Sequence, residues 1–512
     1  MKKIFFVCTL LAVLGSCTKR FEELNTDVTS ADPSVVEANP LFSAAVSFGL
    51  MRAFEFQRVQ ALYPDLYSQY FATSAVYFPT DRYGYNTTWL EAGWNLFYPR
   101  DINNLVTIIN STTASAEQKA IARIWKVFLF HRYVDMYGDI PYFNAAQPDL
   151  PQVFDAQRDI YYDFFKELEE AHSTLAASTA TAAYTNQDPI YGAQQATQIV
   201  QWRRFANTLR LRLAIRINKR DAAKAKTEGE RAIALGTFLS NTDNASARVS
   251  TIVPNPLNQI AGFNEFRMSA AMESVLLGYA DPRLPEYFSV VTDTAAATTK
   301  PYNGVANGLL PAQLTGPNTN PRLSNVGPRF LPANQGTNPI IVLTYAEVCF
   351  NKAEAALLGW NAGTGTAEQW YNLGIEASMR QFGISNATAI AAYQNSAATP
   401  IVPDGLTRPI STLPVRFSSV TAEQEEQIAI QKWLATYPDG FEGWANFRRT
   451  GYPRLYPVAN IESTSDVTPG NFIQRIPYPD AVKGLSTAET TRAGARMGGD
   501  RQSTRLWFAG GN

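Results

Sequence analysis

The chain has 512 residues, enough to bury a large core, and its 46% apolar, 12% aromatic and 17% charged residues are typical of a globular protein. The formal net charge of −1 gives no electrostatic reason to expect a nucleic-acid partner. Only two histidines, His131 and His172, and three cysteines are present, which nearly excludes a zinc site of these residue types. Low charge with many Tyr, Asn, Gln and Thr residues suits a surface that contacts neutral polar ligands.

Residues 1–16 are typical of a secretory signal peptide. Two lysines precede an apolar run at 4–14, which is far shorter than the ~20 residues that span a bilayer. The run ends in Leu-Gly-Ser before Cys17, as in a bacterial lipobox. We expect cleavage before Cys17 and lipidation of its thiol, so that several acyl chains anchor the protein to a membrane through a polar tether at 17–34. An ordinary signal peptide followed by a chance cysteine is the alternative.

The first helix of the body is predicted at 35–58. Residues 63–98 follow and are unusually rich in aromatic side chains. The middle of this stretch, 78–89, contains Pro79 and Gly84 and has no helical periodicity. Because aromatic rings prefer burial, a loop rich in rings is unusual, and we expect it to hold rings and polar groups together.

Strong helical patterns follow at 115–135, 158–177 and 199–220. The first begins with a capping box, Ser115-Ala-Glu-Gln118, and continues with an apolar stripe. The two histidines lie on the first two helices, where we expect them to be partly buried. The third helix carries six arginines outside its apolar face. Because the net charge is close to zero, solvation or ion pairing explains these arginines better than nucleic-acid binding.

The chain changes character at 238–339, where Pro, Gly, Asn and Thr dominate and the only periodic stretch is a predicted helix at 266–277. A long irregular region inside a folded chain is usually functional or disordered. The scattered Tyr, Phe and Leu residues of this region indicate an ordered, loop-rich layer.

Helices return at 343–359 and after Thr366, whose Thr-Ala-Glu-Gln sequence is a second capping box. Together this pair spans about one tetratricopeptide repeat, a helix–turn–helix unit of ~34 residues. Cys349 lies on the apolar face of the first helix. Thr421-Ala-Glu-Gln424 is predicted to cap another helix, and 472–478 is predicted to be a short edge strand. The sequence therefore predicts a mainly α fold with few strands.

Residues 431–453 contain six aromatic side chains and predict a helix, a tight break at Pro438-Asp439-Gly440, and a short second helix that ends at Gly451. We expect a structural aromatic corner, made rigid by stacking of Arg448 and Arg449 on its rings, with Glu442 within their reach. A ligand platform is the alternative.

The chain contains no glycine-rich phosphate-binding motif and no G-x-S-x-G nucleophile elbow. Glu169-Glu170 and Glu425-Glu426 are adjacent on helices, so the carboxylates of each pair point apart. Glycoside hydrolysis needs two carboxylates that meet in space, and such a pair has no sequence signature. The sequence gives no reason to expect catalysis, a cofactor or a metal ion.

Four runs of sequence, together with the lipobox, resemble segments of the SusD/RagB family of nutrient-binding outer-membrane lipoproteins. The runs are 135–142, 205–213, 345–354 and 431–453. The resemblance implies a single domain at 35–512, with a scaffold of tetratricopeptide-like helix pairs and a loop-rich ligand face that includes 238–339. It implies a non-catalytic protein, lipid-anchored at the cell surface, that captures glycans, or less often peptides, for a SusC-type TonB-dependent transporter. Acidic residues soon after Cys17 resemble the surface-export signal of Bacteroidetes lipoproteins.

Sugars bind by stacking their apolar faces on aromatic rings while polar groups take the hydroxyls. We expect the ligand platform in the stretch 77–94, with contacts from Tyr77, Asp81, Arg82, Tyr83, Tyr85, Trp89 and Trp94. Alternatively, these rings cover the repeat core or contact the transporter. Two other functions stay open: a lipid-anchored glycan hydrolase with two carboxylates about 5–10 Å apart, and a helical-repeat adaptor whose groove binds another protein. The ligand and the stoichiometry with the transporter do not follow from the sequence.

Overall fold

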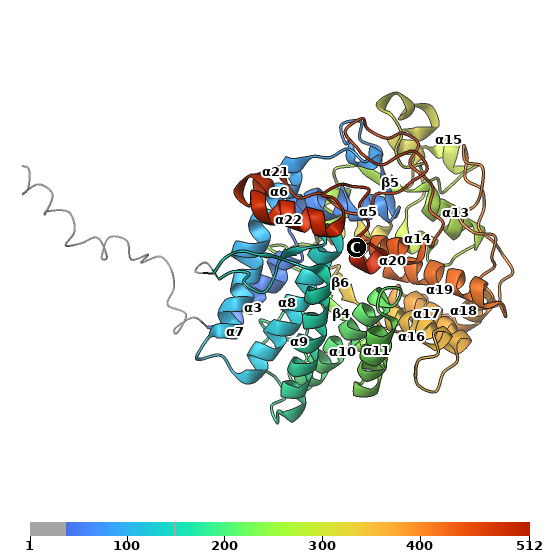
Figure 1. Ribbon diagram of the computed structural model, residues 1–512. Coiled ribbons are helices and arrows are strands. Elements are labelled where there is room, and N and C mark those ends of the chain that lie inside the picture. Colours follow the sequence, from blue (N-terminus) through green and yellow to red (C-terminus); the bar gives the residue numbers. More distant parts are fainter. Residues whose placement is uncertain (1–36, 148–149, 512) are drawn as a thin grey trace, which may run out of the picture.

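Consecutive helices pack in pairs and form the scaffold of the molecule (Figure 1). The computed structural model describes residues 37–147 and 150–511, so the predicted signal peptide, Cys17 and the tether at 17–34 lie outside the described residues. The pairs are α8 (Ala116–Tyr137) with α9 (Gln157–Ala177), α10 (Gln198–Ile217) with α11 (Ala222–Leu235), α16 (Tyr345–Leu357) with α17 (Ala367–Gln381), and α19 (Thr421–Thr436) with α20 (Gly440–Thr450). The predicted mainly α fold with helix pairs is confirmed.

Most of the predicted helix ends are correct because local capping decides them. Ser115 and Thr366 both form the predicted capping boxes with the glutamine three residues later. The predicted cap at Thr421 is wrong, since Thr421 is already the first residue of α19 and no side chain caps that end. Ser418 organises this end instead, and its carbonyl accepts a hydrogen bond from Gln424 Nε2 at 2.7 Å.

The single helix predicted at 35–58 is wrong, because the structure breaks it in two. Helix α3 ends at Gly49, and Met51 adopts a positive φ of 70°. Gly49 faces Leu129 so closely that a Cβ atom there would lie 2.7 Å from Leu129 Cδ2. The elements of this region are α3 (Ala38–Gly49), α4 (Ala53–Phe56), π-helical η1 (Gln57–Ala61), α5 (Pro64–Tyr67), α6 (Thr87–Leu96), π-helical η3 (Phe97–Ile102) and α7 (Asn103–Asn110). The loop predicted at 78–89 therefore ends earlier, at Asn86, whose side chain caps α6.

A loop-rich layer lies on one side of the helix pairs (Figure 1), and the described residues form three two-stranded sheets. The antiparallel pairs are β1 (Phe71–Thr73) with β5 (Phe266–Met268), β2 (Ile140–Pro141) with β3 (Phe154–Asp155), and β4 (Ala245–Ala247) with β6 (Ile340–Leu343). Within 238–339 the structure contains only short helices, 3-10 turns and the strands β4 and β5. The helix predicted at 266–277 begins only at Ala270, because the preceding residues pair with β1.

Short helical elements fill the rest of this layer and the C-terminal part of the chain. Those of the layer are 3-10 turns η2 (Thr80–Arg82), η4 (Asn241–Asp243), η5 (Pro311–Gln313), η6 (Gly316–Asn318), η7 (Asn320–Arg322), η8 (Pro328–Phe330) and η9 (Pro332–Asn334), with helices α12 (Pro256–Ala261), α13 (Ala270–Gly278), α14 (Leu284–Tyr287) and α15 (Thr294–Ala297). Those that follow are α18 (Ala387–Gln394), α21 (Asp480–Leu485), α22 (Thr487–Met497) and 3-10 turn η10 (Trp507–Ala509). In Figure 1, α21 and α22 lie in red beside α6.

The edge strand predicted at 472–478 is wrong. This segment is extended, but it runs along the end of α8 rather than beside another strand. The amide of Ile476 donates to the carbonyl of Met136 at 2.9 Å, and the buried guanidinium of Arg475 donates to the carbonyl of Tyr137 at 2.7 Å. Other backbone amides of the segment donate to the carbonyl of Gln502 and to the Asp500 side chain, so none of these amides pairs with a strand.

The aromatic corner at 431–453 has the predicted form of helix, break, helix and stop. Asp439 caps α20, and Gly451 ends it at a positive φ of 82°. Trp433 and Trp444 are buried, and the guanidinium carbon of Arg448 lies 3.5 Å from the ring centroid of Trp444. These features match the structural corner that we expected.

Glu442 on α20 is the centre of a buried ionic network that joins α10, α19 and α20. It accepts from Arg216 of α10 and lies 3.3 Å from Lys432 Nζ of α19, and its carboxylate is 3.5 Å from Arg212 Nε. Arg212 in turn binds Glu347 of α16, with a shortest distance of 2.5 Å. Burial alone would raise the pKa of Glu442, but the positive charges of Arg216 and Arg212 outweigh burial and hold that pKa well below its usual range.

Four of the five arginines of α10 are ion-paired within the described residues, and those at the centre of the helix are buried rather than solvated. Arg210, Arg212 and Arg216 are all buried, and each has a carboxylate partner. Arg449 binds Glu354 of α16 rather than Glu442. A basic helix face that resembles a nucleic-acid surface in sequence is in fact the inner face of a helix bundle.

We expect Glu442→Gln to lower the free energy of unfolding by about 3–5 kcal/mol, because the change removes the buried negative charge that Arg216 and Lys432 share. Urea unfolding followed by circular dichroism measures it. The matched control is Glu425→Gln, which removes the exposed partner of Lys219, 3.2 Å away, and should cost less than about 1 kcal/mol. Equal losses in the two variants would contradict the central role of Glu442.

Candidate functional site

The predicted ligand stretch at 77–94 does not form one surface. Tyr77 is exposed and Tyr85 and Trp89 are half-buried, whereas Asp81, Arg82, Tyr83 and Trp94 are buried. Trp89 and Trp94 both lie on α6, but five residues at 100° each place them on different faces of the helix. The stretch therefore contributes to two separate places, an exposed surface at Tyr77 and a cavity at Trp94.

The buried polar residues of the stretch fasten it to loops that come later in the chain. Asp81 accepts hydrogen bonds from Asn307 Nδ2 at 2.7 Å and from the amide of Gly308 at 3.1 Å. Arg82 Nε donates to Glu462 at 2.6 Å. Burial raises the pKa of the Asp81 carboxyl to about 6, although its hydrogen-bond donors oppose the shift. Asp81 and Arg82 therefore fix the stretch to the loops that contain Asn307, Gly308 and Glu462.

Four aromatic side chains form what we call the aromatic rim: Phe54, Tyr77, Trp89 and Phe263. Phe54 and Tyr77 are 64% and 63% exposed, and Phe263 is 43% exposed. Phe54 stacks on Phe263, with ring centroids 6.2 Å apart. Tyr77 and Trp89 both pack edge-on against the buried ring of Phe78, at 4.7 and 5.6 Å.

Glu265 joins the two halves of the aromatic rim. Its carboxylate accepts hydrogen bonds from the Tyr77 hydroxyl and from Gln57 Nε2. Its backbone carbonyl accepts from Thr73 Oγ1 at 2.9 Å, beside the pairing of β1 with β5. Rings with free faces around a carboxylate and an amide are the arrangement that a sugar needs, since the rings take its apolar face and the polar groups its hydroxyls.

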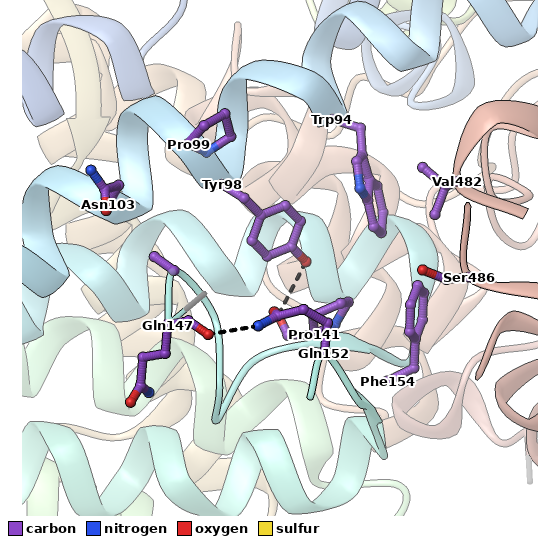
Figure 2. Close-up of a pocket in the computed structure, with 11 residues that line it drawn as sticks. Trp94, Tyr98, Pro99, Asn103, Pro141, Gln147, Gln152, Phe154, Val482 and Ser486 are labelled. Atoms are coloured by element: carbon purple, nitrogen blue, oxygen red, sulfur yellow. Dashed lines mark hydrogen bonds between the residues drawn. The ribbon is translucent and has the colours of Figure 1, made fainter. Parts of the chain in front are cut away.

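The second place is an aromatic cavity of about 540 Å³, between α6, η3, α21 and residues of 141–147 and 152–154 (Figure 2). Trp94, Tyr98 and Phe154 form its aromatic walls. The rings of Trp94 and Phe154 are almost parallel, at 15°, with centroids 6.2 Å apart. A volume of this size falls within the range of ligand pockets, which is about 300–1,000 Å³.

Polar groups at the edge of the aromatic cavity are largely bonded to the protein itself. The Tyr98 hydroxyl donates to the carbonyl of Pro141 at 3.1 Å, and Gln152 Nε2 donates to the carbonyl of Gln147 at 3.1 Å (Figure 2). Burial raises the pKa of Tyr98 well above its ordinary value. The cavity therefore offers ring faces more readily than it offers free hydrogen-bonding groups.

The one cysteine and the two histidines of the described residues, Cys349, His131 and His172, are buried. Burial raises the pKa of the Cys349 thiol to about 12, and burial lowers the pKa of His131 well below its ordinary value. Across residues 37–147 and 150–511, no three His, Cys, Asp or Glu side chains are grouped so that they could hold a metal ion. None of the helices in these ranges is both long and apolar enough to cross a bilayer.

Comparison with known proteins identifies the family. The family model described as "SusD-like: Susd and RagB outer membrane lipoprotein" matches residues 22–509. The chain belongs to the SusD-like family of outer membrane lipoproteins. The resemblance seen in the four sequence runs is thus confirmed. A search of curated protein sequences found no match.

Solved structures of SusD homologues share the fold of this SusD-like protein over nearly its whole length. A chitin-binding SusD homologue from Flavobacterium johnsoniae is 31% identical, with a TM-score of 0.81 and coverage of 92% of this chain and 98% of that one. A homologue from Bacteroides ovatus is 25% identical, with a TM-score of 0.82 and coverage of 92% and 99%. A protein described as chitin-binding is 26% identical, with a TM-score of 0.77 and coverage of 94% and 100%.

Reasoning from the sequence missed several residues of both sites in this SusD-like protein. Phe54 was assigned to a continuous helix, and Phe263 lies in the irregular region, where nothing marked its ring as exposed. Tyr98 and Phe154 lie on either side of the predicted helix at 115–135, and only folding brings them together. An aromatic residue in a sequence predicts burial by default, so exposure of these rings has no local signal.

Because the carboxyl of Asp81 is buried, we expect the free energy of unfolding to depend on pH. Its pKa in the folded protein, about 6, is above its unfolded value of ~3.9. Its contribution to stability is therefore complete below about pH 4 and is lost as the pH rises through 6. Relative to Asp81→Asn, which does not titrate, the wild type should lose up to about 3 kcal/mol of unfolding free energy between pH 4 and 7. Urea unfolding at a series of pH values measures this difference, and a rise instead of a fall would mean that hydrogen bonding outweighs burial.

Proposed function

We propose that this SusD-like lipoprotein captures an oligosaccharide at the cell surface, of the chitin type, and delivers it to a SusC-type TonB-dependent transporter. The observation that carries the proposal is the exposed aromatic rim in a chain 31% identical to a chitin-binding homologue. The second chitin-binding relative, at 26% identity, supports the same ligand class.

The aromatic rim has the chemistry that a chitin chain requires. Pyranose rings have apolar C–H faces that stack on aromatic side chains, and N-acetyl groups add an amide that can hydrogen-bond. Phe54 and Tyr77 are the most exposed rings of the rim. The Glu265 carboxylate between them accepts from Tyr77 and Gln57, and a carboxylate has further lone pairs that can accept from a sugar hydroxyl. Because the rim is an open surface, a long polymer can lie across it without threading.

The aromatic cavity at Trp94 is the second candidate for the same ligand. Its walls are aromatic, as a sugar site requires, and it has space for a short segment. Its rings are more buried than those of the rim, and its polar groups bond to the protein itself. We therefore assign the main ligand contacts to the rim and use Trp94 to tell the two sites apart.

The contacts of the glutamates favour a binding protein over a hydrolase. Glu169 binds Arg210 and Arg231, and Glu426 binds Arg454. Among the rim residues and their hydrogen-bond partners, Glu265 supplies the one carboxylate, whereas glycoside hydrolysis uses two. An adaptor function would use the helix-pair scaffold instead, and it would leave the rim without a role.

Each ring of the rim should contribute measurably to affinity. We expect Tyr77→Ala and Phe263→Ala each to weaken binding of a chitin oligosaccharide roughly tenfold, or about 1.4 kcal/mol, through loss of stacking. Isothermal titration calorimetry measures the change. The control is Tyr162→Ala, which removes a half-buried ring of α9 on the scaffold and should leave affinity unchanged.

The same titrations test the alternatives. If only Trp94→Ala weakens binding of the oligosaccharide, the ligand site is the aromatic cavity and not the rim. Normal affinity in all three variants for an oligosaccharide that does bind would refute the aromatic assignment. Release of shorter sugars during incubation, detected by chromatography, would show a hydrolase instead.

The anchor and the transporter require a test in cells. We expect Cys17→Ser to abolish incorporation of labelled fatty acid and to release the protein from the membrane fraction, because the thiol of Cys17 is the proposed site of lipid attachment. After crosslinking of cells that carry the wild type, a SusC-type transporter should co-purify with it. Retention of Cys17→Ser in the membrane would refute lipidation at this residue, and recovery of many unrelated partners would favour the adaptor.

A further inference from the structure

A cleft of about 570 Å³ lies beside the C-terminal end of α20, and six of its lining side chains are cationic. We call it the cationic cleft. The six are Lys219, Arg408, Arg448, Arg449, Arg454 and Arg505, and none of the other lining residues is acidic. The cleft is separate from the aromatic rim and the aromatic cavity, with which it shares no lining residue.

Carboxylates balance only half of these charges. Lys219 lies 3.2 Å from Glu425, Arg449 lies 2.5 Å from Glu354, and Arg454 lies 2.7 Å from Glu426. For the other three, Arg408, Arg448 and Arg505, the described part of the chain provides no Asp or Glu within 4 Å. The C-terminal carbonyls of α20 carry roughly half a negative charge, which offsets only a fraction of this excess.

Arg448 forms the inner wall of the cationic cleft and is held firmly. Its guanidinium carbon lies 3.5 Å from the ring centroid of Trp444 and 5.1 Å from that of Phe508, and its Nη1 donates to the carbonyl of Gln474 at 2.9 Å. Its Nη2 is buried and has no hydrogen-bond partner among the described residues. Burial lowers the pKa of Arg448 to about 9, and the negative charge of Asp135, which makes no ion pair with Arg448, offsets burial only in part.

Backbone carbonyls hold the guanidinium of Arg408 in one orientation. Its Nη1 donates to the carbonyl of Arg454 at 2.8 Å and its Nη2 donates to that of Leu455 at 2.7 Å, while its guanidinium lies over the ring of Tyr456. Arg505, in contrast, is exposed at the mouth of the cleft. Two fixed guanidinium groups and a third that is free to move are well suited to surround one anion.

We propose that the cationic cleft binds a phosphate group. A phosphate monoester carries about −1.5 to −2 charge at pH 7, so it offsets three unpaired guanidinium groups better than a single carboxylate does. Arginine binds phosphate oxygens through paired N–H donors. The phosphate can come from a phosphorylated sugar, free phosphate or a lipid headgroup, and the volume of the cleft is sufficient for a sugar attached to it. This site does not depend on the proposed function at the aromatic rim.

The test uses the full chain with Cys17→Ser, so that no acyl anchor contributes to binding. Calorimetry with inorganic phosphate and with glucose 6-phosphate should show saturable binding, and unphosphorylated glucose should not bind. We expect Arg505→Glu to weaken phosphate binding at least tenfold. Arg501→Glu is the matched control, since Arg501 is exposed, has no carboxylate partner among the described residues and does not line the cleft. Circular dichroism checks that both variants are folded.

Vesicles distinguish the sources of the phosphate. Binding to phosphatidylglycerol vesicles but not to phosphatidylcholine vesicles, with loss in Arg505→Glu, would assign the site to an anionic lipid headgroup. Binding of the soluble phosphates without vesicle binding would assign it to a phosphorylated sugar or free phosphate. The proposal is overturned if none of these probes binds saturably, or if Arg505→Glu and Arg501→Glu weaken binding equally.

Discussion

The buried carboxylate of Glu442 is the interaction on which the rest of the structure depends. It lies where α10, α19 and α20 meet and neutralises positive charges that could not otherwise be buried. Because it fixes α20 against α10, it also fixes the surface of α20 on which α5 packs. Gly440 allows this approach, since a Cβ atom there would lie 2.6 Å from the amide of Asp65. The ionic network thus positions α5, at the start of the aromatic stretch 63–98, as well as the scaffold.

Hydrogen bonds continue from this centre toward the aromatic rim. Trp433 Nε1 donates to the carbonyl of Ser68 at 2.9 Å, and the Tyr70 hydroxyl donates to the carbonyl of Trp433 at 2.6 Å. Strand β1 begins immediately after Tyr70 and pairs with β5, which brings Glu265 beside Tyr77. The corner at 431–453 is therefore a support for the rim, although its own rings are buried.

Local signals in the sequence predicted the scaffold well and the two sites poorly. A capping residue such as Ser115 and an apolar stripe act over a few residues, so the helices could be read directly. The break after Gly49 depends on Leu129, and strand β5 depends on β1, and neither partner is close in sequence. The ligand role of 77–94 stays a prediction, and the separate exposures of its rings follow from tertiary packing, which the pattern of residue types does not contain. Of the residues that line the cationic cleft, only the adjacent pair Arg448-Arg449 stands out in the sequence.

The pairing of Phe71 with Met268 has a consequence for the order of folding. Phe54, Tyr77 and Trp89 lie far along the chain from Phe263 and Glu265, and contacts between such segments form late because loop closure must precede them. A chain that has been only partly synthesised or translocated would lack Phe263 and Glu265. The proposed sugar site would then be one of the last features to form, and only complete chains would contain it.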